Sequence, residues 1–294
     1  MRITHQSQFD SALRRISLGQ AGTAQAEQRL ATGKRLDRPS TDPIAMHRAL
    51  ELRATLKVKD QAAANAADGL MWVNLADSKL QTVVERLQRA RELAVQGASF
   101  GNTNEQQAIA TEVAAIRDQA VALANSKHKG RALFAGFSGG DAITDIAGTW
   151  TYTGDNGTVE RRIGDNEVMP INVTAADAFG FTSGRDLFSV LDDFEAAALA
   201  GSQGGMDTAI GEIDGILTDT LNALTQLGAS GRRIEAAQSR HLDEINTVRA
   251  QLSELEDMDI NEAVLDLKMQ ETAYQAALAA FGHANRSSLV EFLR

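Results

Sequence analysis

The chain has 294 residues and a formal net charge of −10, with 43% hydrophobic, 23% charged and only 5% aromatic side chains. This acidic balance argues against nucleic acid as the main partner, and the absence of cysteine excludes disulfides and thiolate chemistry. No apolar run approaches the roughly 18 residues that span a bilayer, and residues 1–9 lack the apolar stretch of a cleaved signal peptide, so we expect no membrane association and no signal-peptide route.

The two ends of the chain carry opposite charge. Residues 1–60 contain eleven Lys and Arg against six Asp and Glu, whereas residues 241–294 contain four against ten. If the two ends lie together, their fields are complementary, which favours correct pairing more than it adds raw stability. Two unrelated solvated surfaces would give the same counts.

The first predicted element is an amphipathic helix over residues 1–32 that has few large apolar residues. Large apolar side chains recur there at coiled-coil spacing, but glycine and polar residues interrupt the pattern. The seam consists of Phe9, Leu13, Ile16 and Leu30.

A long helix follows this element. Residues 40–42 offer N-cap oxygens, and Pro43 suits the first helical position. Apolar residues then recur at spacings of three and four, which predicts one helix over about residues 44–97. Gly97 and Gly101 mark its end.

Three further seams predict helices over residues 109–123, 210–224 and 245–255. Between them, from Gly136 to about Gly205, the helical period is lost and glycine is frequent. Strand-like alternation predicts strands at residues 150–153, 159–163 and 167–173, with an Asn-Gly turn between the first two and Pro170 placing the third at an edge.

The last predicted helix, over residues 270–294, has as few large apolar residues as the first. Its seam consists of Tyr274, Leu278, Phe281, Leu289 and Phe292. Five or six such anchors cannot order thirty residues, because burying one Leu or Phe contributes about 1.5–3 kcal/mol while ordering each backbone unit costs about 1–2 kcal/mol. We therefore expect both ends to be loose in the free monomer and to order on assembly; docking of both ends on their own domain is the alternative.

Five segments in the same order resemble the flagellin superfamily and, within it, the group of hook–filament junction proteins (hook-associated proteins of the third kind) more than the filament subunits. The first segment contains the superfamily's hallmark turn, Arg38, Pro39, Ser40, Asp42 and Pro43, with Thr41 departing from the more usual Asp. The segments are residues 30–45, 124–136, 152–188, 274–278 and 288–293.

The resemblance implies a structural subunit that leaves the cell unfolded through the flagellar type III export apparatus and resides in the extracellular flagellum. It implies self-association in a ring through the terminal helices, contacts with the first hook-associated protein and with flagellin, and a cytosolic export chaperone that binds the C-terminal part.

Residues that could carry chemistry show no pattern of a known site. The five histidines have no metal-ligand spacing, and no Lys-Ser or Lys-Thr follows the glycines at residues 136–140. The acidic clusters at residues 192–193 and 254–259 lack a calcium-loop spacing, so we interpret them as solvated helix charge. We expect no catalytic residue, no cofactor and no metal.

Together these observations predict a mainly α fold with an inserted β-rich domain, a long-helix antiparallel coiled-coil bundle of flagellin type with paired N- and C-terminal segments. The expected domains are a terminal helical domain (1–40 with 265–294), a long-helix bundle (41–138 with 201–264) and a small β-rich outer domain (139–200). Two alternatives to the junction subunit stay open: a filament-forming flagellin, and a soluble helical enzyme with an acidic site.

Overall fold

The computed structural model describes residues 5–36, 38–40, 42–99, 102–164 and 167–292, and it describes no side chains for residues 5–9 and 283–292. The chain divides into two compact units. Unit 1 comprises residues 1–58 and 245–294, and unit 2 comprises residues 59–244.

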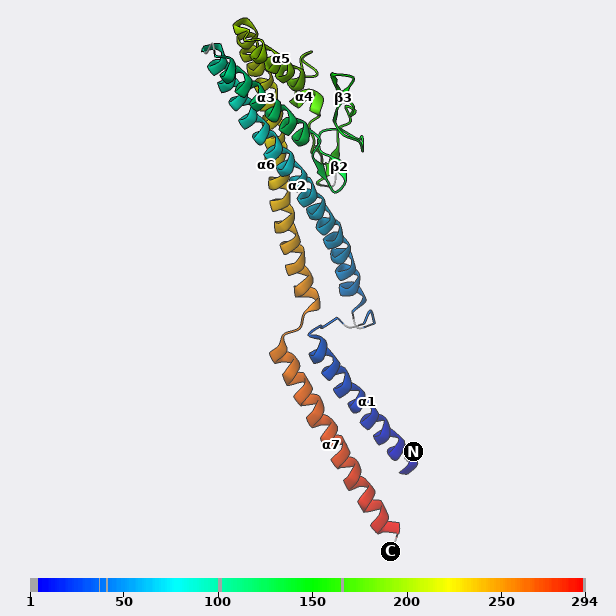
Figure 1. Ribbon diagram of the computed structural model, residues 1–294. Coiled ribbons are helices and arrows are strands. Elements are labelled where there is room, and N and C mark those ends of the chain that lie inside the picture. The colour runs from blue at the N-terminus through cyan, green and yellow to red at the C-terminus, as the bar shows by residue number, and fades with distance from the viewer. Residues whose placement is uncertain (1–4, 37, 41, 100–101, 165–166, 293–294) are drawn as a thin grey trace. The chain divides into compact units, whose positions relative to one another are not determined.

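Long helices dominate both units (Figure 1). The helices of the described residues are α1 (His5–Thr32), α2 (Pro43–Ser99), α3 (Thr103–Ala124), α4 (Ala175–Ala178), α5 (Leu187–Leu199), α6 (Gln203–Glu256) and α7 (Ile260–Phe292). The strands are β1 (Lys127–His128), β2 (Arg131–Ala132), β3 (Ile143–Ile146), β4 (Thr149–Tyr152), β5 (Glu160–Arg162) and β6 (Val168–Pro170).

Helix α2 begins where the sequence predicts. Asp42 Oδ1 accepts hydrogen bonds from the backbone N–H groups of Ile44 and Ala45 at 3.1 and 2.9 Å, and Pro43 occupies the first helical position. The carboxylate satisfies two of the donors that a helix start leaves unpaired. The predicted long helix over residues 44–97 is confirmed.

The two seams predicted over residues 210–224 and 245–255 lie on a single helix, α6. The glycines at positions 228 and 231 interrupt the pattern in the sequence, but buried apolar residues continue on both sides of them. Packing of that face outweighs the cost of about 1 kcal/mol that each interior glycine imposes on a helix.

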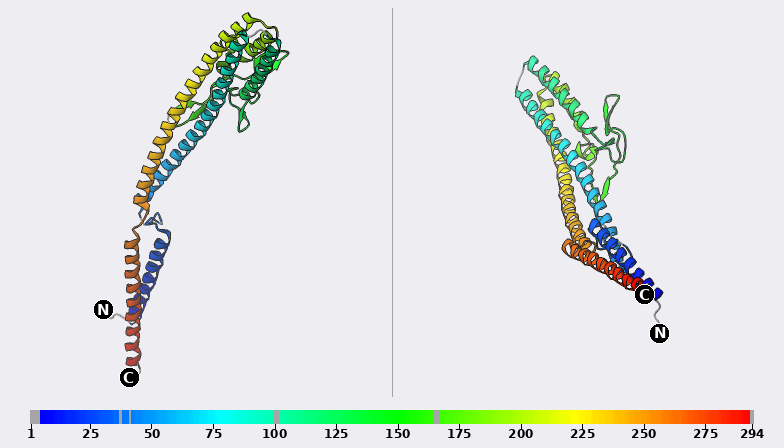
Figure 2. Two further views of the ribbon diagram at one scale, coloured as in Figure 1. Left: turned by 60° about the vertical axis from the view of Figure 1, so that its left-hand side comes forward. Right: turned by 90° about the horizontal axis from the view of Figure 1, so that it is seen from below.

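In unit 2, α2 and α6 run antiparallel and side by side (Figures 1 and 2). Their buried seams join α3 and α5 in one hydrophobic core. Its largest fully buried side chains include Leu80, Leu87, Phe134, Phe179, Phe188 and Phe194. Unit 2 therefore has a core of its own, built from large side chains.

The middle of the chain is less β-rich than the sequence predicts. The sequence shows no helical period over residues 136–205, yet a helix, α5, forms there and packs against α3. Asp186 caps α5 by accepting hydrogen bonds from the N–H groups of Phe188 and Ser189. Seven of its residues are buried. Few polar residues therefore alternate with the apolar ones, and the sequence shows no clear helical period.

The strand pairing also differs from the prediction. Strand β4 pairs antiparallel with β3, and β5 pairs with β6, so no hairpin joins residues 150–153 to residues 159–163. The segment with the Asn-Gly pair is held by Asp155 instead, whose Oδ1 accepts hydrogen bonds from the backbone N–H groups of Phe137 and Gly157. The β3–β4 turn instead uses Ala147 and Gly148 at φ of 56° and 81°. Pro170 does lie in an edge strand, since β6 belongs to a two-stranded sheet.

In unit 1, α1 and α7 pack along one another in antiparallel fashion (Figure 1). The predicted pairing of the N- and C-terminal segments is therefore confirmed. A small separate cluster, formed by Leu36, Ala45 and Ala49 with Met46 and Leu252 against it, lies where α2 begins.

The contrast between buried and exposed leucines on the long helices gives a stability prediction. Leu87→Ala removes a buried side chain of unit 2, so we expect it to lower the free energy of unfolding of that unit by about 2–5 kcal/mol. Urea denaturation of the full chain, followed by the fluorescence of Trp72 and Trp150, both of which lie in unit 2, measures this change. The matched control, Leu221→Ala on an exposed position of α6, is expected to cost less than about 1 kcal/mol; equal losses for both variants would contradict the core described here.

Candidate assembly interface

The contact between α1 and α7 is made by small residues. A Cβ atom at Gly19 would lie 3.2 Å from Tyr274 Cδ2, and one at Gly22 would lie 2.9 Å from Gln270 Oε1. Glycine at these positions lets the helix axes approach, so it is part of the seam and not the interruption that the sequence suggests. Among the described residues of the two helices, Ala26 and Ala263 are the only buried hydrophobic ones.

The predicted seam residues are only partly covered by this contact. Ile16, Leu30, Tyr274 and Phe281 are half-buried. Leu13 and Leu278 are exposed, at 44% and 42%. The side chains of Phe9, Leu289 and Phe292 lie outside the described residues.

Other large apolar side chains of the pair face solvent. Leu18 of α1 is 71% exposed, and α7 exposes residues on more than one face of the helix. The exposed set on α7 is Ile260, Val264, Leu265, Met269 and Leu278. A helix that is apolar on several faces is typical of one that is surrounded by neighbours.

Backbone hydrogen bonds join the α1–α2 connection to the α6–α7 connection. The Arg35 N–H donates to the Glu256 carbonyl oxygen at 2.6 Å, and the Met258 N–H donates to the Gly33 carbonyl oxygen at 3.2 Å. Lys34 and Asp257 face each other in this antiparallel bridge. We call residues 33–35 and 256–258 the clasp.

Side-chain charges reinforce the clasp. Glu256 is 4% exposed, and its Oε2 accepts hydrogen bonds from Arg53 Nη2 at 2.9 Å and Lys34 Nζ at 3.4 Å. Its Oε1 forms an ion pair with Arg53 Nε at 2.8 Å, although none of the described residues donates to it in hydrogen-bond geometry. Lys34 Nζ also donates to Asp257 Oδ1 at 2.6 Å. The interpretation of Glu256 as solvated charge is therefore wrong, because this carboxylate is buried between two cations.

The clasp shifts two pKa values. The hydrogen bond from Lys34 lowers the pKa of Asp257, with a smaller contribution from the Ser253 hydroxyl. The hydrogen bond to Asp257 raises the pKa of Lys34, followed by its interaction with Glu256. The charged forms of both groups are thus favoured in the folded chain.

The residues of the hallmark turn lie beside the clasp in unit 1. Arg38, Pro39, Ser40 and Pro43 are exposed, and Asp42 is half-buried as the cap of α2. Arg38 Nη2 donates to Gln28 Oε1 at 3.4 Å. Whether these side chains act in assembly stays a prediction.

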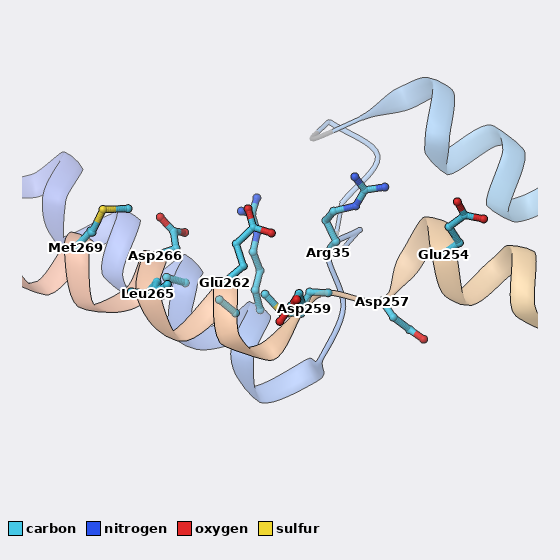
Figure 3. Close-up of a pocket in the computed structure, with 12 residues that line it drawn as sticks. Arg35, Glu254, Asp257, Asp259, Glu262, Leu265, Asp266 and Met269 are labelled. Carbon is cyan, nitrogen blue, oxygen red and sulfur yellow. The ribbon is translucent and has the colours of Figure 1, made fainter.

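A groove of about 610 Å³ opens where α6 ends and α7 begins (Figure 3). Its lining combines apolar residues with five carboxylates and two guanidinium groups. Glu262, Asp266 and Met269 project from the same side of α7 (Figure 3), as their spacing of four and three dictates. Sequence reasoning missed this groove, since it depends on the break between two helices.

The remaining candidate groups are occupied in structural roles. Asp192 accepts hydrogen bonds from Trp150 Nε1 and from Arg117, so its interpretation as purely solvated charge is wrong. His241 is buried, and its Nε2 pairs with the Ile163 carbonyl oxygen. In the described part of the chain, no three His, Asp or Glu side chains gather as metal ligands, and none of the helices there has the length and apolarity to cross a bilayer.

Comparison with known proteins gives a consistent family. The bacterial flagellin N-terminal helical region matches residues 3–138, and the bacterial flagellin C-terminal helical region matches residues 210–293. Flagellar hook-associated protein 3 of Salmonella typhimurium is 29% identical over 318 residues and covers the whole of both chains. Flagellin of Bacillus subtilis is 24% identical over 314 residues, again covering both chains.

Solved structures share the fold. The flagellar junction protein FlgL from Legionella pneumophila aligns with a TM-score of 0.61 at 14% identity, over 71% of this chain and 99% of that one. The predicted mainly α fold of flagellin type is confirmed.

The clasp gives a prediction in acid. Because the pKa of Asp257 is lowered from 3.8, its ion pair stabilises the clasp above that pH and is lost as the pH falls through the folded pKa. In Lys34→Met the pKa of Asp257 should rise back toward 3.8, as measured by NMR titration of the carboxyl carbon. Lys268→Met, which removes the separate pair with Glu271, should leave the Asp257 titration unchanged; a shift of equal size in this control would contradict the assignment.

Proposed function

Since the chain belongs to the bacterial flagellin family, with that family's N-terminal and C-terminal helical regions at its two ends, we propose that it is a structural subunit of the bacterial flagellum that forms the junction layer between hook and filament. The observation that supports this most is the end-to-end likeness to flagellar hook-associated protein 3, at higher identity than to the Bacillus subtilis flagellin. The role is mechanical and needs no catalytic residue.

Assembly proceeds through the terminal helices. Full burial of a Leu side chain contributes about 1.5–3 kcal/mol, and the α1–α7 pair exposes several large apolar side chains while burying only alanines among its described hydrophobic residues. Copies that cover Leu13, Leu18 and Leu278 gain the stabilisation that one copy lacks. The ring of copies is the state in which α1 and α7 are fully packed.

The partners follow from this position in the flagellum. One side of the layer contacts the first hook-associated protein, and the other contacts flagellin. The chain reaches this place outside the cell by export in an unfolded state, which the absence of cysteine permits, and a cytosolic chaperone covers the C-terminal segment before export.

A filament-forming flagellin remains the second candidate because it shares the fold and the full-length match. A junction protein and a flagellin differ in how far they polymerise on the hook. Incubated with isolated hook-basal bodies of the same bacterium, the purified protein is expected to add one thin layer at the hook end and stop. Continued growth into filaments in electron micrographs would assign it as a flagellin, and failure to bind the hook end would contradict the junction role.

The same assay tests the terminal helices. Leu278→Gln places a polar group on a 42% exposed position of α7, so the folded monomer should keep its helical circular dichroism while binding to hook ends falls about tenfold or more. The matched control is Leu221→Gln, at 49% exposure on α6 in unit 2, for which we expect binding as in the natural chain. Equal binding of both variants would exclude Leu278 from the interface.

A further inference from the structure

The sequence contains one Asn-Gly pair, Asn156–Gly157, which does not form the hairpin turn predicted for it. Asparagine followed by glycine is the pair most prone to spontaneous deamidation, because glycine has no Cβ atom to hinder attack by its own backbone nitrogen. Asn156 is exposed, and its side chain has no hydrogen-bond partner among the described residues. The amide that would react is therefore accessible and unrestrained.

The Asn-Ser pair of the chain, Asn125–Ser126, also has a small second residue, but its amide is held. Asn125 Nδ2 donates to the Ile143 carbonyl oxygen, and Asn125 Oδ1 accepts from the Ile143 N–H, both at 2.9 Å. These two hydrogen bonds keep the amide away from the backbone nitrogen of the next residue. Of the two pairs, Asn156–Gly157 is therefore the one whose side chain is free to react.

Deamidation at this pair uses the backbone nitrogen of Gly157, which attacks Cγ of Asn156. The new N–Cγ bond closes a succinimide ring, the Cγ–Nδ2 bond breaks, and Nδ2 leaves as ammonia with the proton of the Gly157 N–H. Water then opens the ring at either carbonyl group, which gives aspartate or isoaspartate at position 156. The rate depends on how readily the Gly157 nitrogen loses its proton and reaches Cγ.

The fold restrains Gly157 at both of its backbone polar groups. Its N–H donates to Asp155 Oδ1 at 2.8 Å, and the same oxygen accepts from the Phe137 N–H at 2.8 Å. The Gly157 carbonyl oxygen accepts from Asn172 Nδ2 at 3.0 Å, and Asn172 is 8% exposed. The attacking nitrogen is thus engaged by a carboxylate, and the residue that carries it is anchored to a buried side chain.

Asp155 is exposed, yet its backbone is fixed in place. Its N–H donates to the Ala135 carbonyl oxygen at 3.1 Å, and its carbonyl oxygen accepts from Tyr152 Oη at 2.5 Å. A Cβ atom at Gly136 would overlap the Asp155 carboxylate, so this carboxylate packs directly on the backbone at Gly136. A hydrogen bond to an ionised acceptor is roughly twice as strong as a neutral one, so a carboxylate held in this way restrains the Gly157 N–H.

We propose that Asn156 is a site of spontaneous deamidation and that Asp155 is the positioning residue that slows the reaction, by keeping the Gly157 N–H in a hydrogen bond and away from Asn156 Cγ. The site lies in unit 2, and the proposal does not depend on the proposed function. Isoaspartate adds a methylene to the backbone before Gly157, which displaces the Gly157 carbonyl oxygen from Asn172. Asn172 Oδ1 also accepts from the Val159 N–H at 2.7 Å, so the modification disturbs the chain just before β5.

Peptide mapping by mass spectrometry, after incubation of the folded full chain in mildly alkaline buffer, measures the rate at Asn156. Asp155→Ala should deamidate there about tenfold faster or more than the natural chain, because a hydrogen bond to a charged group is lost. Asp155→Ser, whose hydroxyl accepts from the N–H two residues on, should restore much of the protection. The matched control is Asp145→Ala, which removes the corresponding bond from the Gly148 N–H in the β3–β4 turn and should leave the rate at Asn156 unchanged.

The outcomes decide the role of Asp155. In concentrated urea the natural chain and Asp155→Ala should convert at similar, fast rates, since the fold no longer restrains Gly157. Equal rates for the two folded chains would overturn the proposal. Slower conversion in folded Asp155→Ala would also overturn it, because the carboxylate would then act as a base for the Gly157 N–H.

A second measurement needs no variant. Hydrogen exchange of the Gly157 amide in the natural chain, followed by NMR, reports whether this N–H is held in its hydrogen bond. We expect exchange at least about tenfold slower than in the unfolded chain. Exchange as fast as in the unfolded chain would overturn the protective role of Asp155.

Discussion

Over the side chains that the structure describes, helices α1 and α7 bury only alanine among their hydrophobic residues, and the proposed assembly depends on this shortage of core. Ala26 and Ala263 are buried there, whereas Leu18, Leu265 and Met269 face solvent. Unit 2, by contrast, encloses phenylalanine and leucine side chains completely. We therefore expect unit 2 to fold alone and the terminal helices to be completed by neighbours.

The clasp lies at the junction between the terminal helices and the long ones. Two backbone hydrogen bonds and the buried carboxylate of Glu256 connect residues 33–35 to residues 256–258. These contacts hold the α1–α2 connection against the α6–α7 connection in a fixed register, so that the end of α1 lies beside the start of α7.

Sequence reasoning found the elements that depend on local patterns. Pro43 behind Asp42 marks the start of α2, and sustained heptads predict its length. It failed where tertiary packing decides. The sequence pattern did not predict helix α5, because most of its sides are buried. The predicted Asn-Gly turn does not join two paired strands; instead, Asp155 next to it accepts a hydrogen bond from the Phe137 N–H. The roles of Gly19 and Glu256 depend on residues more than 200 positions away in the sequence. A pattern read over a short stretch of sequence cannot predict such contacts.

We expect α1 and α7 to lack the packing that would keep them folded in a single copy. Hydrogen exchange of their backbone amides, compared between the free monomer and the assembled layer, tests it most directly. In the monomer we expect α1 and α7 to exchange at rates close to those of an unfolded chain, while α2 and α6 of unit 2 exchange slowly. After assembly we expect strong protection of all four helices. Protection of α1 and α7 in a verified monomer to the same degree as α6 would contradict it.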